Sequence, residues 1–393
     1  MTRKTALFFI IIILGFALTG CWGQREINEL GIVQVTGVDK EPDGKFRITV
    51  MAVIPIGAAT GESMNRSGVW VGSAVGTSMS EASRNLRSTA SKRLVWVDNK
   101  IFVIGEELAR QGLDEFMDYF MRNRELRYRN FVMVSKGKAM DVLSIPSDIE
   151  ENLPIELQGM IQNTEEWAKA YIPDMKDFSI SYLDKRIEAV AGRLTYYETD
   201  MNTFSTAREH YYKMETNGNR KKIAAITGSA VFKGSKLVGW LGEEETKAYR
   251  WIIGEVTSGI ATIRKNKQMV SIEIRDLNTD IKAVVEEDAI QFTIKLELSG
   301  EITEYIDQSN VLDEYTVKNI EKNFEDFFKK EMEKTVKKAQ KEYRSDFLGF
   351  GRILYREYPN TWRKIEKDWD KIFPRVEIAY KVKVTVDRMG ERF

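Results

Sequence analysis

The sequence has very few of the residues that most enzyme and metal sites require. It contains one cysteine, Cys21, and one histidine, His210. A single cysteine excludes an internal disulfide, a CxxC redox pair and a cysteine-rich zinc site, and a single histidine excludes a site built from several imidazoles. His210 stands beside two tyrosines in an expected strand, which favours a structural histidine over a catalytic one.

The chain also lacks an excess of charge of either sign. Lys plus Arg and Asp plus Glu each number 59, so the formal net charge is zero. Nucleic-acid binders carry a clear basic excess, so the balance argues against such a partner. With 393 residues, 43% of them hydrophobic, the chain has enough apolar material for about two to three globular domains. Its mean hydropathy of −0.35 excludes a protein that crosses the membrane many times.

The first segment has the composition of a secretory signal. Arg3 and Lys4 precede an unbroken apolar run at 6–18, and the next charge is Arg25. A basic start, a short apolar run and then small residues are typical of a signal peptide.

The end of this segment, Leu18-Thr19-Gly20-Cys21, matches the bacterial lipobox. In that motif the cysteine thiol accepts a diacylglyceryl group and the chain is cleaved before the cysteine. We therefore expect residues 1–20 to be a lipoprotein signal peptide and Cys21 to be the lipidation site. The alternative is an uncleaved single-span anchor, because the uncharged stretch 5–24 is just long enough to cross a bilayer.

The first part of the mature chain predicts a mixed α/β N-terminal domain over 21–200, because strands alternate with helices. Apolar runs on either side of a Pro-Asp-Gly turn indicate a hairpin. The expected elements are strands at 32–35, 45–53, 101–104, 131–134 and 187–197, and helices at 78–89, 106–122 and between 155 and 183. The composition of 48–80, with its five glycines, suits a long exposed loop or an irregular edge segment, and its glycine-rich part 57–76 is interpreted as a contact loop.

The rest of the chain predicts two further units, which makes the fold class α+β and multidomain. Short β segments at 201–245 indicate a small β-rich middle domain. In the C-terminal domain, 246–393, apolar residues alternate at 290–298 and 376–386 and recur every three or four positions at 317–343. With a second helical stretch at 347–372, these patterns predict an antiparallel sheet packed by a long amphipathic helix pair.

Two charged clusters resemble binding sites for ions. Asp39-x-Glu41-x-Asp43-Gly44 resembles the opening of an EF-hand loop, but Val50 stands where the closing glutamate belongs, so a hairpin turn is favoured. The arginines between 122 and 129 suit a phosphate or lipid headgroup, although a solvated helix end explains them more simply.

No other motif supports catalysis. The carboxylate runs 243–245 and 286–288 are interpreted as a helix start and a turn. Gly349-Phe350-Gly351 lacks the third glycine and the preceding strand of a dinucleotide loop. The sequence therefore predicts no catalytic residue, no metal and no cofactor.

The segment Cys21 to Leu30 resembles the mature N-terminus of the Ger(x)C spore germination lipoproteins, although Gly23 replaces their usual acidic residue. Similar segments follow in the same order along almost the whole mature chain. They are Ser91 to Trp96, Ile101 to Leu113, Arg122 to Arg129, Thr227 to Phe232, Lys236 to Gly239, Asp346 to Gly351, Pro359, Trp362, Trp369 and the last strand.

This resemblance implies a C subunit of a nutrient germinant receptor in a spore-forming bacterium. Such subunits are α/β-type proteins without known enzymatic activity. They are lipid-anchored on the outer face of the cytoplasmic (spore inner) membrane and work with integral-membrane A and B subunits. The sequence alone leaves two alternatives: an extracytoplasmic lipoprotein that binds a small molecule itself, and, less favoured, a lipid-anchored cell-wall hydrolase.

Overall fold

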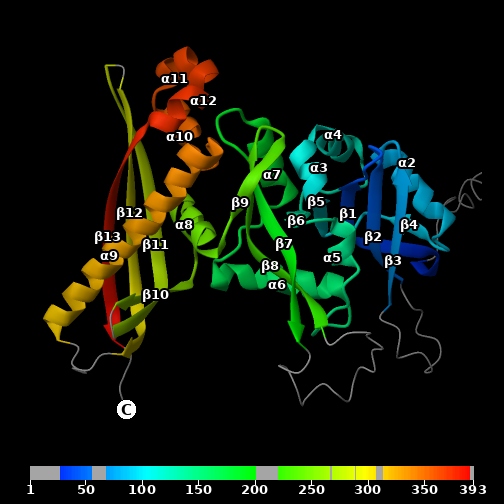
Figure 1. Ribbon diagram of the computed structural model, residues 1–393, viewed down its shortest axis with the longest axis horizontal. Helices are drawn as coiled ribbons and strands as arrows, with labels where there is room; N and C mark the ends of the chain where they lie inside the picture. Colours follow the sequence, from blue (N-terminus) through cyan, green and yellow to red (C-terminus); the bar gives the residue numbers. More distant parts are fainter. Residues whose placement is uncertain are drawn as a thin grey trace, which may run out of the picture.

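The protein is built from two β-sheets with helices packed against them (Figure 1). The structure is a computed structural model. It describes residues 27–54, 68–200, 220–265, 268–287, 289–306 and 313–389.

The first sheet has nine strands in the order β3-β2-β1-β5-β6-β7-β8-β9, with β4 paired to β1. Strands β1, β5, β6 and β7 run parallel, and hairpins extend the sheet at both ends. The strands are β1 (Leu30–Lys40), β2 (Phe46–Val53), β3 (Val69–Gly76), β4 (Arg93–Val95), β5 (Ile101–Gly105), β6 (Phe131–Ser135), β7 (Val190–Asp200), β8 (Arg220–Lys233) and β9 (Lys236–Leu241).

Helices cover both faces of this sheet. Successive residues of its central strands point to opposite faces, and both sets are apolar, so both faces need a covering layer. Phe102 and Ile104 lie in one hydrophobic core, and Ile101 and Val103 lie in the other. The first core is covered by α2 (Met79–Asn85), α3 (Glu106–Gln111), α4 (Asp114–Arg122) and α7 (Met175–Leu183). The second is covered by α5 (Ala139–Leu143) and α6 (Leu153–Trp167). The predicted mixed α/β architecture is confirmed.

The second sheet has the order β10-β11-β12-β13. Its strands are β10 (Gly259–Lys265), β11 (Gln268–Glu286), β12 (Ala289–Ile306) and β13 (Glu377–Met389). Its helices are α8 (Glu243–Ile253), α9 (Glu314–Lys337), α10 (Phe350–Glu357), α11 (Pro359–Ile365) and α12 (Trp369–Ile372).

The last strand differs from the expected antiparallel sheet, since β13 pairs with β12 in parallel. The helices α9 to α12 lie between these two strands in the chain. This helical connection returns the chain to the end of the sheet where β12 began, so β13 runs in the same direction as β12.

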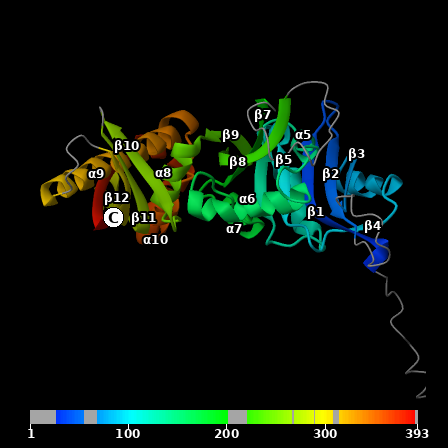
Figure 2. The same cartoon turned by 90° about the horizontal axis from the view of Figure 1, so that it is seen from below.

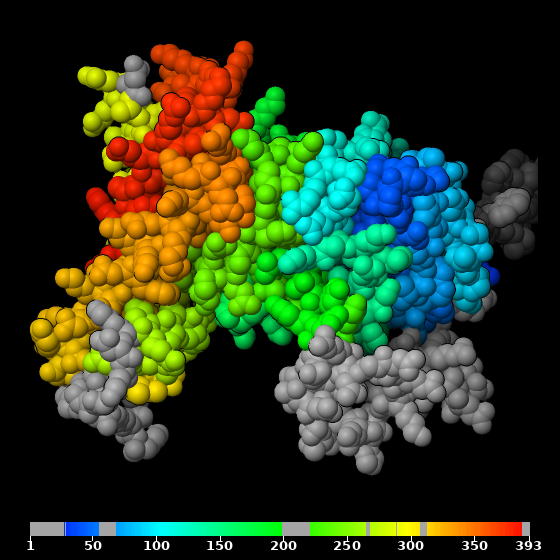
Figure 3. All heavy atoms as spheres, in the orientation of Figure 1, coloured from blue at the N-terminus to red at the C-terminus, as the bar shows by residue number. Residues whose placement is uncertain are grey.

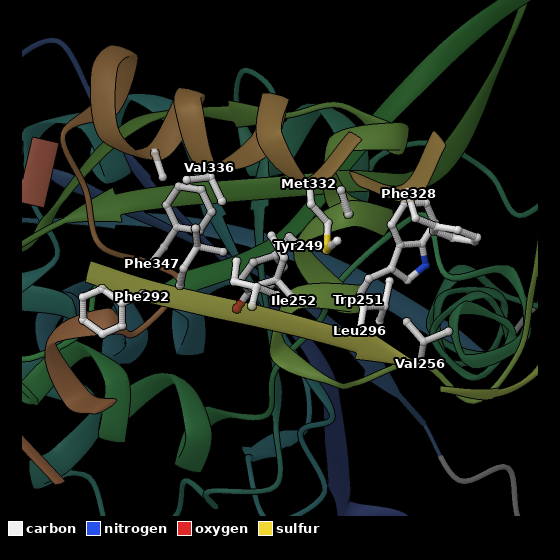
Figure 4. Packing of buried hydrophobic residues seen from close by; sticks show 14 of the residues in the cluster. Tyr249, Trp251, Ile252, Val256, Phe292, Leu296, Phe328, Met332, Val336 and Phe347 are labelled. Carbon is white, nitrogen blue, oxygen red and sulfur yellow. The ribbon is translucent and has the colours of Figure 1, made fainter. Parts of the chain in front are cut away.

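The long helix α9 packs its apolar stripe on this sheet, as its three- and four-residue spacing predicts. Phe328 and Met332 are fully buried, and the Phe328 ring lies 4.6 Å from that of Trp251 on α8 (Figure 4). Leu296 of β12 points into the same cluster (Figure 4). The helix ends in η4 (Lys338–Tyr343), a π-helical turn.

Several element boundaries differ from those expected. The helix predicted at 106–122 is two helices, because Gly112 has a φ of +134° that ends α3. The helix predicted at 347–372 is divided into α10, α11 and α12, and Pro359 begins the second of these. Strands β10 and β11 were not predicted.

Two predictions concern the glycine-rich stretch and the middle unit. Of the stretch interpreted as a contact loop, 69–76 forms β3 at the sheet edge, so the loop is wrong there and the alternative of an edge segment agrees with the structure, although β3 is a regular strand; 57–67 lies outside the described residues. Strands β8 and β9 of the predicted middle unit extend the first sheet through β7. The domain division at 200 and 245 stays a prediction, while the sheet itself continues past residue 200.

None of the helices within the described ranges is both long and apolar enough to cross a membrane.

Candidate functional site

The two sheets meet at a junction where β9 leads directly into α8. One hydrophobic cluster spans this junction, because Val231 and Leu241 of the first sheet share it with α8, α9 and the second sheet. Figure 3 shows the orange surface of α9 and α10 lying against the green surface of the neighbouring strands. The two sheets therefore share one continuous hydrophobic cluster.

Arg250 on α8 fastens this junction from the inside. Only 8% of the residue is exposed, and its guanidinium donates to three backbone carbonyls. Its Nη1 lies 2.7 Å from the Thr164 oxygen and 3.1 Å from the Ala170 oxygen, and its Nε lies 2.8 Å from the Glu255 oxygen. Thr164 is in the last turn of α6, where a cation is favoured, and its carbonyl also accepts from the Ala168 amide at 2.9 Å. Arg250 thereby joins α8 to the end of α6.

Tyr343, the last residue of η4, pairs with β9 through its hydroxyl. The Tyr343 Oη accepts from the Trp240 amide at 3.0 Å and donates to the Trp240 carbonyl at 2.8 Å. The ring needs Gly239 beneath it, since a Cβ there would lie 2.3 Å from ring carbons. Single π-helical turns occur often at functional sites, and this one carries the side chain that contacts the first sheet.

Polar contacts on both sides of Tyr343 complete the connection. Ser345 Oγ donates to the Phe232 carbonyl at 2.6 Å. Lys338 forms an ion pair with Glu245 at 2.8 Å, and the same glutamate accepts from the Gly242 amide at the start of α8. The segment after α9 is therefore held by both the first sheet and α8.

Asp346 organises the next part of the chain. Its fully buried carboxylate accepts four hydrogen bonds, from the amides of Gly349, Phe350 and Gly351 and from Nε1 of Trp369, at 2.7–3.0 Å. Burial raises the pKa of Asp346 to about 7, and the four donors oppose this rise because they favour the charged form. The carboxylate begins α10 and fixes Trp369 at the start of α12.

Two acidic residues connect the loop before β7 to this region. Asp184 forms ion pairs with Arg186 at 2.6 Å and with Arg352 of α10 at 3.1 Å. Glu188 accepts from the Gly234 amide at 2.7 Å. Burial raises the pKa of Glu188 to about 7.

The turn that resembles an EF-hand is a hairpin between β1 and β2, as predicted. Asp39 is buried and accepts from the amides of Ala139 and Met140, and Glu41 forms an ion pair with Arg47. Asp43 forms an ion pair with Lys45. The three carboxylates thus face different partners. No group of three metal-ligating residues occurs in the part of the chain that the structure describes.

Two carboxylate runs agree with the simpler interpretations as far as the structure describes them. Residues 243–245 begin α8, Glu286 ends β11 and Glu287 lies in the turn that follows, while Asp288 is outside the described residues. Gly349-Phe350-Gly351 binds the Asp346 carboxylate. Cys21 and His210 lie outside the described residues, so their roles stay predictions.

Two surface grooves lie on the second sheet. One, of about 440 Å³, runs between β13 and α9, and the other, of about 610 Å³, lies between the β11–β12 hairpin and α12. Both are open, unlike the enclosed apolar pockets that usually hold small molecules. Charged side chains make up most of the lining of the first groove, and charged and apolar side chains line the second in equal number. At the first groove, Glu325 and Glu321 accept from the amides of Val384 and Val386. These bonds protect the edge of β13 from pairing with another strand.

Sequence reasoning did not identify the junction residues. Arg250 stands in the otherwise buried run AYRWII, and a charge in such a run was the available signal. Tyr343 carried no comparable signal, because its partner is 103 residues away. Asp346 was part of the resemblance, but its role as a buried acceptor is seen only in the structure.

Comparisons with known proteins connect this architecture to spore germination. The family model "Spore germination protein N-terminal domain" matches residues 23–196, and "Spore germination B3/GerAC like, C-terminal" matches residues 227–390. Spore germination protein KC of Bacillus subtilis (strain 168) is 27% identical, covering 100% of this chain and 97% of the relative. Spore germination protein B3 of the same organism is 26% identical, covering 99% and 98%.

A solved structure has the same fold. The crystal structure of the GerBC protein matches with a TM-score of 0.57 and 20% sequence identity, covering 90% of this chain and 97% of the other. At this identity the match describes the fold alone. The overall fold is therefore a known architecture.

Proposed function

The chain belongs to the Ger(x)C family of spore germination proteins, and we propose that it is the lipid-anchored, non-enzymatic C subunit of a nutrient germinant receptor. The observation that carries this proposal is that the two family models match in order across the mature chain. The first match begins at residue 23, two residues after the lipobox cysteine.

The subunit acts by holding a large folded surface over its membrane partners. Arg250 and Tyr343 give the two sheets a defined relative position, so a contact at one sheet is mechanically connected to the other. The partners in this proposal are the integral-membrane A and B subunits. The subunit stabilises or transmits their nutrient-driven state.

A non-enzymatic role agrees with how the polar groups are used. The buried carboxylates of Asp39 and Asp346 are occupied by backbone amides, which leaves them structural rather than reactive. The open grooves also do not favour the alternative of a small-molecule-binding lipoprotein. Calorimetry of the protein with candidate nutrients distinguishes the two, because a scaffold subunit should show no heat of binding.

The anchoring part of the proposal places Cys21 on the outer face of the spore inner membrane. Two acyl chains contribute about 0.8 kcal/mol per buried methylene, enough for stable attachment. We expect wild-type protein in the membrane fraction with a diacylglyceryl group on Cys21, and a Cys21→Ala variant that is lost from that fraction. Immunoblotting of fractionated spores and mass spectrometry of the N-terminal peptide measure both.

A Gly23→Ala variant is the matched control, because it changes a neighbouring residue and leaves the lipobox intact. It should be lipidated and retained like the wild type. A wild-type chain with an unmodified Cys21 that keeps residues 1–20 in the membrane fraction would instead support the single-span anchor.

A further inference from the structure

Helix α7 exposes two apolar side chains to solvent. Ile180 is 48% exposed and Leu183 is 61% exposed, one turn apart on the same side of the helix. The opposite side carries Met175 and Phe178, which are buried in the first sheet's core. Two large aliphatic side chains on one helix face form an apolar strip rather than scattered surface residues.

Aromatic side chains lie at both ends of this strip. The Lys176 amide, at the start of α7, donates to the Tyr128 carbonyl at 3.0 Å, and Tyr128 is 49% exposed. Beyond the other end of α7, the Arg186 guanidinium lies 4.2 Å from the centre of the Tyr355 ring, which is 41% exposed on α10. We call the surface formed by Tyr128, Lys176, Ile180, Leu183 and Tyr355 the α7 face.

Uncompensated basic charge surrounds the α7 face. Arg127 and Arg129 flank Tyr128 and are exposed, as are Lys176 and Lys185. None of these four forms an ion pair within the described ranges of the chain, whereas the nearby Asp184 is neutralised by two arginines. Exposed Asp177 and Glu125 reduce this positive charge but do not cancel it.

The position of the chain start points to what covers the α7 face. The described chain begins at η1 (Ile27–Glu29), and in Figure 2 η1 lies on the lower side of the molecule together with α7 and α10. Only residues 22–26 separate η1 from Cys21, a stretch that spans at most about 20 Å. A membrane that holds Cys21 therefore lies within about 20 Å of η1, which is on this side in that view.

We propose that the α7 face rests on the headgroups of an anionic membrane, with the long axis of the protein parallel to the bilayer. This inference rests on the lipid anchor proposed above. Ile180 and Leu183 enter the boundary between headgroups and acyl chains, where tyrosine is also favoured. The arginines and lysines bind lipid phosphates, which guanidinium groups pair with well.

The test uses the full-length lipoprotein with a single introduced thiol. Ile180→Cys carries an environment-sensitive fluorophore, and the matched control is Ile155→Cys on α6, an isoleucine 41% exposed on the opposite face of the same sheet. Both proteins are reconstituted in phosphatidylglycerol-containing vesicles and in phosphatidylcholine vesicles. We expect the fluorophore at position 180 to shift to shorter wavelengths and to be quenched by brominated acyl chains only in the anionic vesicles, and the fluorophore at position 155 to remain as in water.

Each other outcome contradicts a defined part of the account. Equal, water-like emission at positions 180 and 155 in anionic vesicles overturns the docking while leaving the anchor intact. A fluorophore at 180 that is protected in native spore membranes but not quenched by lipid assigns the face to a protein and also overturns it. Labelling of wild-type Cys21 shows a free thiol and contradicts the anchor itself.

Discussion

Replacing Asp346 with alanine should lower the free energy of unfolding by about 3–5 kcal/mol, because four buried donors lose this acceptor and only the Gly349 amide keeps another, the backbone carbonyl of residue 346 at 3.3 Å. Those donors are three amides at the start of α10 and the indole of Trp369. A buried donor without a hydrogen-bond partner has lost its bonds to water and gains no bond in the protein, which destabilises the folded state. Urea unfolding followed by tryptophan fluorescence measures the change, since Trp362 and Trp369 pack in this region.

Two variants make this prediction specific. Asp346→Asn keeps the shape but presents an amide NH₂ to donor groups, so it should also destabilise, by less than alanine. Asp326→Ala removes an exposed carboxylate from α9 and should leave the unfolding midpoint almost unchanged. A midpoint for Asp346→Ala equal to that of Asp326→Ala would contradict the role assigned to the buried carboxylate.

The second large effect is expected at Arg250. An Arg250→Met variant retains much of the packing but removes the donors to the Thr164, Ala170 and Glu255 carbonyls, at a cost of about 2–4 kcal/mol. The loss should be local to the junction. Hydrogen exchange of the amides in α8 and at the end of α6 should therefore accelerate, while exchange in β1 and β2 stays as in the wild type.

Arg110→Met is the matched control, because Arg110 forms an exposed ion pair with Glu106 on α3. Exposed pairs of this kind contribute about 0–1 kcal/mol, so exchange at the junction should not change. Arg250→Met with wild-type exchange in α8 would show that the hydrophobic cluster alone holds the two sheets together.

The sequence predicts elements with a regular hydrophobic period well, and it predicts elements poorly where charged residues interrupt the period. Alternation in β12 and the three- and four-residue spacing in α9 identify both, because each buries one face only. Strand β11 was missed because its central part, IEIRDLNTDIK, mixes charges into both positions of the alternation. The predicted helices are divided at Gly112 and at Pro359, two residue types that commonly end helices. The prediction gave more weight to the helical spacing of the apolar residues than to these two residues.

The junction could not be predicted because its key side chains bind backbone. Arg250 and Thr164 are 86 residues apart, and a carbonyl acceptor leaves no trace in residue identity. Asp346 could be placed in a motif through the family resemblance, but its burial depends on how α10 to α12 fold over it. For Cys21 the sequence is the only source of the assignment. The lipobox predicts that this cysteine is lipidated, and the residue lies outside the described part of the chain, so the assignment stays a prediction.

The central claim, a lipid-anchored receptor subunit, is tested most directly by nutrient-triggered germination. Spores that lack this gene are complemented with the wild type or with Cys21→Ala, and dipicolinate release is followed for each class of nutrient. The account predicts loss of the response to one nutrient class, full restoration by the wild type and only weak restoration by Cys21→Ala. A Cys21→Ala protein that restores germination as well as the wild type, or a deletion that responds normally to every nutrient, would contradict it.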